Sequence, residues 1–146
     1  MELDEVARTL KSIPLFANLD VAKLKLLAFA SHLLTFDDQE VIFETGDTAD
    51  SAYLIESGVA DVYIEESDRR IKVNQLGTND IFGEMALFLK SGRSATVVAS
   101  GTLVAMKLEG DMFLKMVTEN PDAALGVMKA LSEKIVTASE QIVKNA

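Results

Sequence analysis

The sequence contains no cysteine, only one histidine and only two prolines among its 146 residues. Without cysteine the chain can form no disulfide, no iron–sulfur cluster and no thiolate metal site. The single histidine, His32, argues against a cupin-like metalloenzyme, because such barrels use two or three histidine ligands. A cupin-like enzyme therefore stays only as a minor alternative.

Long hydrophobic runs are also missing. No stretch approaches the roughly 20 apolar residues that a membrane-spanning helix needs. The first residues, 1–5, are acidic where a signal peptide would be basic. We therefore expect a soluble, cytoplasmic protein with no membrane partner.

Positive charge is scarce. The chain has 14 lysines and arginines against 23 acidic residues, and its formal net charge is −9. Nucleic acids and acidic membrane surfaces attract basic faces, and this composition offers none. We therefore predict no direct nucleic-acid binding.

What the sequence does have is enough apolar material, 49% of residues, for one well-packed domain over residues 1–146. Apolar residues at helical spacing predict a helix near the N-terminus that Pro14 ends, and Asp20 is a suitable N-cap for a second helix. Residues 1–31 are thus expected to be helical.

Short extended runs separated by turn residues follow the two helices. Their spacing of about ten residues predicts an all-β barrel or jelly roll over residues 32–109. We therefore expect a mainly β fold with flanking helices at both ends. The expected strands cover residues 32–36, 40–43, 51–56, 59–65, 70–76, 93–99 and 102–108.

One stretch combines residue types that suit a sugar phosphate. Gly83 lets a ligand approach the backbone closely, and a short helix beginning near Glu84 would leave unpaired amide groups that favour an anion. Arg93 adds a planar charged fork that matches two phosphate oxygens. Glu84 would repel the same anion, so we expect it to accept hydrogen bonds from neutral hydroxyls.

Residues 82–95 resemble the phosphate-binding cassette of cyclic nucleotide-binding domains, the sensory module of catabolite activator proteins and protein kinase A regulatory subunits. Residues 44–58 resemble the same family's ladder of Gly-Asp, Asp, Tyr, Ile and Gly. The resemblance implies a β-roll, a double-stranded β-helix, with N-terminal helices and a C-terminal helix pair over residues 110–146.

The resemblance also implies roles for single residues. Glu84 matches the glutamate that binds the ribose 2′-hydroxyl, and Arg93 matches the arginine that pairs with the cyclic phosphate. The cassette helix and the residues after the arginine supply backbone contacts, and three apolar residues wall the base. These further positions are Gly83, Met85, Ala86, Ser94 and Ala95 for the backbone contacts and Val73, Leu76 and Phe82 for the wall.

Ser94 follows the arginine as in catabolite activator proteins, which implies cAMP as the ligand in preference to cGMP. Gly92 stands where many members have proline, and Asn79 where many have glycine. Asn tolerates left-handed backbone nearly as well as glycine, so neither departure predicts loss of binding.

The C-terminal part should contain a short helix capped by Asp111 and a long helix that Pro121 begins. Six apolar residues of the long helix have coiled-coil spacing, which predicts either packing on the domain itself or a parallel homodimer. These residues are Ala124, Met128, Leu131, Ile135, Ala138 and Ile142. By resemblance, Thr137 and Ser139 are expected to contact the base.

We therefore predict a cyclic nucleotide receptor, not an enzyme, in which ligand binding repositions the C-terminal helices. No effector domain is recognisable after the last helix, so the output is expected on a separate protein effector or in a longer chain. The alternative is a β-roll that does not respond to cyclic nucleotides and serves for dimerisation or docking.

Overall fold

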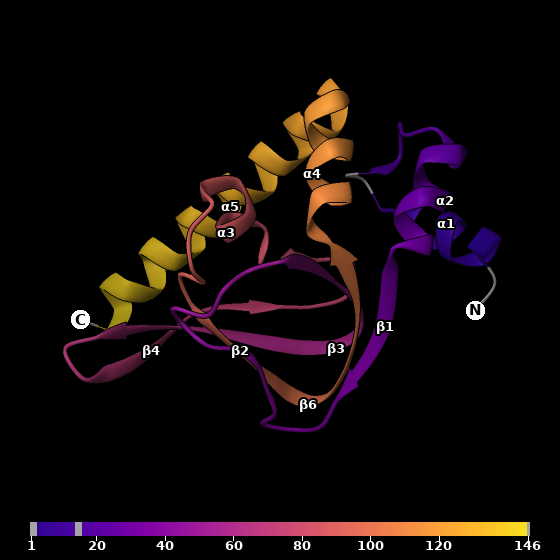
Figure 1. Ribbon diagram of the computed structural model, residues 1–146. Coiled ribbons are helices and arrows are strands. Elements are labelled where there is room, and N and C mark those ends of the chain that lie inside the picture. The colour runs from indigo at the N-terminus through magenta and orange to yellow at the C-terminus, as the bar shows by residue number, and fades with distance from the viewer. Residues whose placement is uncertain (1–2, 14–15, 146) are drawn as a thin grey trace.

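A computed structural model describes residues 3–13 and 16–145 of the chain (Figure 1). An antiparallel β-roll forms the body, and helices gather over one end of it, which confirms the predicted fold class. The helices are α1 (Leu3–Lys11), α2 (Val21–Phe29), α3 (Glu84–Leu89), α4 (Gly110–Glu119) and α5 (Pro121–Asn145). The strands are β1 (Ser31–Phe36), β2 (Val41–Phe43), β3 (Ser51–Glu66), β4 (Arg69–Leu76), β5 (Ile81–Phe82) and β6 (Thr96–Glu109).

Two long strands replace four of the predicted short ones. β3 runs through the expected break at Ser57 and Gly58, and β6 runs through the expected break at Ser100 and Gly101. The two strands pair along most of their length, with register shifts around Ser57. Both glycines have positive φ, so each strand bends where the sequence suggested that it ends.

The sheet order is β1-β6-β3-β4, with β2 paired to β6 and β5 paired to β3. β3 and β4 form a hairpin whose two connecting residues, Ser67 and Asp68, both have positive φ. Such a turn matches the right-handed twist of the strands it joins. β5, although only two residues long, ties the segment before α3 to Tyr53 and Leu54 of β3.

Buried apolar side chains form two clusters. The first lies where α1, α2, α4 and α5 cover one end of the roll, and it includes Leu10, Leu24 and Phe113. The second fills the interior of the roll and includes Ile55, Phe82 and Leu103. The second cluster ends at the cassette, so the packed interior positions the segment that carries the candidate site.

Two predicted helix starts can be compared with the structure. Asp20 caps α2 as expected, and its side chain accepts a hydrogen bond from the amide of Ala22 at 3.2 Å. The prediction that Asp111 caps α4 is wrong, since the Glu109 side chain accepts the amide hydrogens of Asp111 and Met112. Pro14 lies outside the described residues.

The long helix α5 packs against β4 and against α4 (Figure 1). Ala124 and Leu131 of the predicted coiled-coil seam pack against the first apolar cluster, whereas Met128 is exposed. Much of the seam is therefore used within the chain. In the described part of the chain, no helix is long and apolar enough to cross a membrane.

The close approach of paired strands β3 and β6 at Gly58 gives a stability prediction. A Cβ atom on Gly58 would lie 2.3 Å from the main-chain oxygen of Thr102, and the φ of Gly58 is +96°. We expect Gly58→Ala to lower the free energy of unfolding by about 2 kcal/mol or more, measured by urea denaturation. Gly77→Ala is the control, because a Cβ there would meet no atom within 4 Å. Equal stability of the two variants would show that the chain accepts a side chain at Gly58 despite the close contact and the positive φ.

Candidate functional site

A cavity of about 240 Å³ lies between the β-roll, the cassette and α5. It is much larger than the space that a single water needs, so it can hold a small molecule. Ten of the twelve predicted site residues line it. These are Val73, Leu76, Phe82, Gly83, Glu84, Met85, Ala86, Arg93, Ser94 and Ala95.

Arg93 is a charged residue with only 5% of its surface exposed. Its Nη1 donates to the carbonyl oxygen of Gly83 at 2.6 Å, and its Nη2 donates to the carbonyl oxygen of Ser51 at 2.9 Å. The guanidinium carbon lies 4.1 Å from the ring centroid of Phe43. These contacts hold the guanidinium in one orientation against an aromatic face.

The main chain of Arg93 is fixed by the loop between β2 and β3. The Arg93 amide donates to the carbonyl oxygen of Asp47, and the Gly46 amide donates to the carbonyl oxygen of Arg93, both at 2.8 Å. A Cβ atom on Gly92 would lie 3.0 Å from the Gly46 oxygen, so the two loops are in close contact. The Gly-Asp turn thus positions the arginine.

Burial lowers the pKa of the Arg93 guanidinium from its ordinary value. Tyr53, Asp50 and Asp47 act in the opposite direction, in that order, and Glu84 adds to them. A guanidinium remains protonated at neutral pH even so. Its Nε has no hydrogen-bond partner among the described residues, although it is buried.

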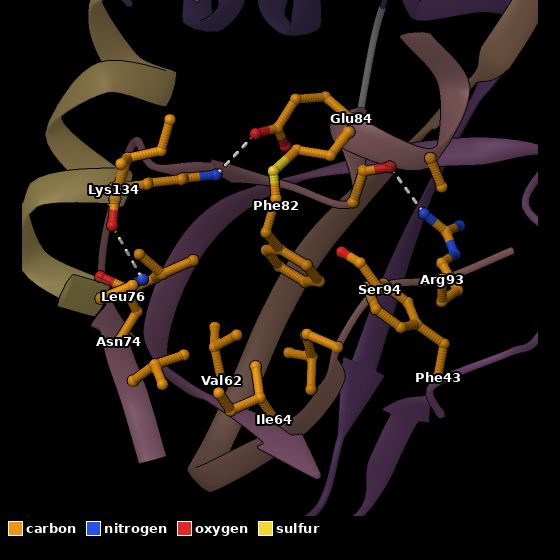
Figure 2. A pocket seen from close by; sticks show the side chains of 18 residues that line it. Phe43, Val62, Ile64, Asn74, Leu76, Phe82, Glu84, Arg93, Ser94 and Lys134 are labelled. Atoms are coloured by element: carbon orange, nitrogen blue, oxygen red, sulfur yellow. Dashed lines mark hydrogen bonds and ion pairs between the residues drawn. The ribbon is translucent and has the colours of Figure 1, made fainter. Parts of the chain in front are cut away.

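Glu84 is the first residue of α3 and is 3% exposed. Its Oε1 lies 2.8 Å from the Nζ of Lys134 on α5, as the dashed line in Figure 2 shows. Its Oε2 is buried and finds no hydrogen-bond donor in the part of the chain that the structure describes. A buried carboxylate oxygen without a donor is costly, so this atom is suited to accept a hydrogen bond from a ligand.

Lys134 connects α5 to the cassette and to β4. Its ammonium group also donates to the carbonyl oxygen of Ile81, immediately before the cassette. Its own carbonyl oxygen accepts from the side-chain amide of Asn74 on β4 at 3.4 Å. The side chain of Lys134 is 19% exposed, so the ion pair with Glu84 is largely shielded from water.

Most of the remaining cavity wall is apolar. Figure 2 shows Val62 and Ile64 on the floor and Phe82 between the Glu84 end and the Arg93 end in this view. Phe82 stacks on Tyr53 with ring centroids 5.1 Å apart, which fixes the plane of its ring. A flat apolar group can therefore be enclosed while the charged ends bind polar groups.

A family model described as the cyclic nucleotide-binding domain matches residues 33–120, which is more than half of the chain. The chain belongs to the cyclic nucleotide-binding domain family. The cassette with Glu84 and Arg93 lies inside the matched residues, and Lys134 lies outside them.

Known relatives within the family are longer proteins. The cAMP-dependent protein kinase regulatory subunit of Mucor circinelloides f. lusitanicus is 34% identical over 124 residues, which cover 85% of this chain and 28% of that protein. The regulatory domain of Toxoplasma gondii PKA, solved with cAMP, has a TM-score of 0.79 and 26% identity and covers 89% of this chain and 50% of the other.

The fold also occurs in a solved structure of a protein described as cAMP-independent. The regulatory subunit of a cAMP-independent protein kinase A from Trypanosoma brucei has a TM-score of 0.70 and 24% identity, over 87% of this chain and 51% of the other. The β-roll alone therefore does not identify the ligand.

Two predicted site residues lie elsewhere. Thr137 and Ser139 are exposed on α5 and are not part of the cavity wall, although Thr137 borders a neighbouring groove. The residues that α5 turns toward the cavity are Lys134, Ile135 and Ala138. The contact of Thr137 and Ser139 with a base therefore stays a prediction, and neither residue lines this cavity.

Sequence reasoning also missed five residues of the roll that line the cavity. Four of them are apolar or aromatic residues on strands, and nothing in a strand pattern separates a cavity wall from ordinary core. Asn74, the fifth, had a usable signal, since it is a polar residue in the alternating run of β4. The five are Phe43, Val62, Ile64, Asn74 and Val97.

Gly83 gives a prediction that separates crowding from backbone strain. Its φ is +83°, and an added Cβ would lie 2.8 Å from Nη1 of Arg93. Gly46 has a similar φ of +93° but open space around it. We expect Gly83→Ala to cost about 1 kcal/mol more unfolding free energy than Gly46→Ala in urea denaturation, because only the first displaces the guanidinium. Equal costs would show that Arg93 adapts freely.

Proposed function

We propose that this chain is a cyclic nucleotide receptor domain with cAMP as its ligand. One observation carries the proposal. Two buried side chains of opposite charge line the same cavity, and each has a buried polar atom without a hydrogen-bond partner in residues 3–13 and 16–145, Nε of Arg93 and Oε2 of Glu84. A ligand with an anion and a hydroxyl would satisfy both atoms.

Arg93 binds the cyclic phosphate in this proposal. Its two terminal nitrogens are held by the Gly83 and Ser51 carbonyl oxygens, and its Nε is left for a phosphate oxygen. A charge-assisted hydrogen bond in a site shielded from water is stronger than a neutral one. Ser94 and Ala95 follow Arg93 on the cavity wall and are proposed to approach the same phosphate.

Glu84 binds the ribose 2′-hydroxyl. Its Oε1 is used by Lys134, and Oε2 is the acceptor that remains for the hydroxyl proton. Gly83, Met85 and Ala86 line the cavity beside it and are proposed to approach the sugar phosphate. The apolar wall, including Val73, Leu76 and Phe82, takes the base. The choice of cAMP over cGMP rests on Ser94 and on cAMP-bound relatives such as the Toxoplasma domain.

A receptor explains the cavity better than an enzyme does. The ionisable side chains among its described wall residues are Glu84, Arg93 and Lys134, and the carboxylate is ion-paired. The described wall holds one carboxylate and no imidazole, so it offers no pair of such groups for acid–base catalysis. The matched relatives are regulatory subunits.

The proposed output is the position of α5. We propose that residues 1–146 are one domain. It would comprise N-terminal helices over 1–31, a β-roll over 32–109 and C-terminal helices over 110–146. Because α5 forms part of the cavity wall, a bound nucleotide can favour one placement of the helix over another. The effector is proposed to be another protein or a further part of a longer chain, since the chain spans 26% and 28% of two kinase regulatory subunits it matches.

A second copy of the chain is a candidate partner for α5. Four apolar residues on this helix each have at least 57% of their surface accessible. They are Leu125, Met128, Val136 and Val143.

The alternative function is a β-roll that serves only for dimerisation or docking, and a cAMP-independent protein does share the fold. The two unpartnered charged atoms in the cavity favour the receptor.

Calorimetry and thermal unfolding with cAMP test the receptor proposal. A ligand that binds only the folded state stabilises it by about 2.7 kcal/mol at 100 times its dissociation constant, so the melting temperature should rise. We expect Arg93→Ala to weaken cAMP binding by about 2 to 4 kcal/mol, because the phosphate loses its charged partner. Arg69→Ala, at an exposed arginine, should bind like the wild type. Undiminished binding by a folded Arg93→Ala variant would overturn the phosphate assignment.

A comparison of cAMP with 2′-deoxy-cAMP tests Glu84. We expect the wild type to bind cAMP about tenfold more tightly, since the deoxy ligand leaves Oε2 unsatisfied. In Glu84→Met, which has no carboxylate to accept the hydroxyl proton, the two affinities should be nearly equal. The ratio is the diagnostic quantity, because any general weakening by the substitution affects both ligands. An unchanged ratio would place the 2′-hydroxyl elsewhere.

A further inference from the structure

Asn74 is a polar side chain in a mostly apolar part of the cavity. The neutral side chains with an oxygen or nitrogen atom on the described wall are Asn74 and Ser94. Ser94 follows Arg93, whereas Asn74 lies across the cavity from Arg93 in Figure 2, with Val62 and Ile64 between them in that view. In the proposed function the phosphate lies at Arg93, so the far edge of the base points toward Asn74.

A β-bulge turns Asn74 toward the cavity. The pairing register of β3 and β4 skips Val73, which lies between Asn74 and Lys72. Successive side chains of a regular strand point to opposite faces, yet Val73 and Asn74 both line the cavity. Bulges re-aim side chains in this way and are frequent beside functional sites. The strand therefore departs from regular pairing at the residue that places an amide on the wall.

A neighbouring main-chain group sets the orientation of the Asn74 amide. Its Nδ2 donates to the carbonyl oxygen of Lys134 at 3.4 Å, as the second dashed line to Lys134 in Figure 2 shows. Because a carboxamide carries its donor and its acceptor on separate arms, this bond leaves Oδ1 as the acceptor for a ligand. Within residues 3–13 and 16–145, Oδ1 accepts no hydrogen bond. The wall thus presents an oriented acceptor at the base end of the cavity.

Adenine and guanine differ in the group that such an acceptor would meet. Adenine carries an amino donor at position 6, whereas guanine carries a carbonyl acceptor there. Two acceptors that face each other share no hydrogen, so both stay unsatisfied. To bond guanine, Asn74 would have to turn its amide, and the Lys134 carbonyl oxygen would lose its donor. The observed orientation therefore favours adenine.

We propose that Asn74 determines the base specificity of the site, because its Oδ1 accepts a hydrogen bond from the 6-amino group of adenine. This inference rests on the proposed function, and it gives a physical reason for cAMP that is independent of Ser94. If Asn74 only held the Lys134 carbonyl group, its removal would affect all nucleotides alike. The diagnostic quantity is therefore the ratio of affinities for ligands that differ only in the base.

The test is calorimetry with cAMP, cGMP and purine riboside 3′,5′-cyclic phosphate, which lacks the 6-amino group. All three ligands have the same ribose and cyclic phosphate, so the contributions of Glu84 and Arg93 cancel in the ratios. We expect the wild type to bind cAMP about 5- to 10-fold more tightly than the purine analogue, since the analogue leaves Oδ1 unpaired. cGMP should also bind more weakly than cAMP.

Substitutions at Asn74 assign the preference to this residue. In Asn74→Leu, of similar size but without an acceptor, cAMP and the purine analogue should bind with nearly equal affinity, and the preference over cGMP should shrink. Gln75→Leu is the matched control, because the Gln75 amide donates to Asp61 and lies outside the described cavity wall. It should keep the wild-type ratios. Asn74→Ala, which adds no bulk to the wall, gives the same test if Asn74→Leu fails to fold.

Failure of this inference is distinguishable from failure of the receptor function. Wild-type protein that binds none of the three ligands would overturn the receptor function itself. Wild-type protein that binds cAMP and the purine analogue within about twofold of each other would overturn only the role of Asn74. An unchanged ratio of these two affinities in a folded Asn74→Leu or Asn74→Ala variant would do the same, since another group would then recognise the amino group.

Discussion

The buried guanidinium of Arg93 is the constraint on which the site depends. A charge that is 5% exposed must be surrounded by acceptors, and the chain supplies carbonyl oxygens from Gly83 and Ser51. Those two carbonyls belong to the cassette and to the start of β3, so the arginine connects segments that are far apart in sequence. The Gly46–Asp47 turn then fixes its backbone, which gives a structural purpose to residues that carry no ligand chemistry.

The sequence allowed much of this arrangement to be predicted, because the informative residues are chemically unusual in their settings. Gly83, Glu84 and Arg93 combine a permissive backbone with opposite charges at a short spacing, and the structure places all three on one cavity. Turn residues located most strand limits. The strand ends predicted at Gly58 and Gly101 were wrong, because a positive φ there bends a continuous strand instead of ending it.

The parts that could not be predicted depend on tertiary placement. Helical periodicity showed that one face of α5 is apolar, but the same pattern suits packing on the domain and pairing with another helix. Only the packing of α5 against β4 decides that Ile135 and Ala138 face the cavity and that Thr137 does not. Lys134 was missed for a related reason, since a lysine on a helix is usually solvated and its partner Glu84 is 50 residues away.

The positively charged cavity wall belongs to a chain whose formal net charge is −9. An anionic ligand at long range therefore meets a repulsive field, and attraction dominates only near the pocket. Because mobile ions screen charges beyond about 10 Å at 0.1 M salt, moderate ionic strength weakens the long-range repulsion more than the buried contacts. The rate of ligand capture should thus increase with salt over the range in which the complex itself is little affected, the reverse of electrostatic steering.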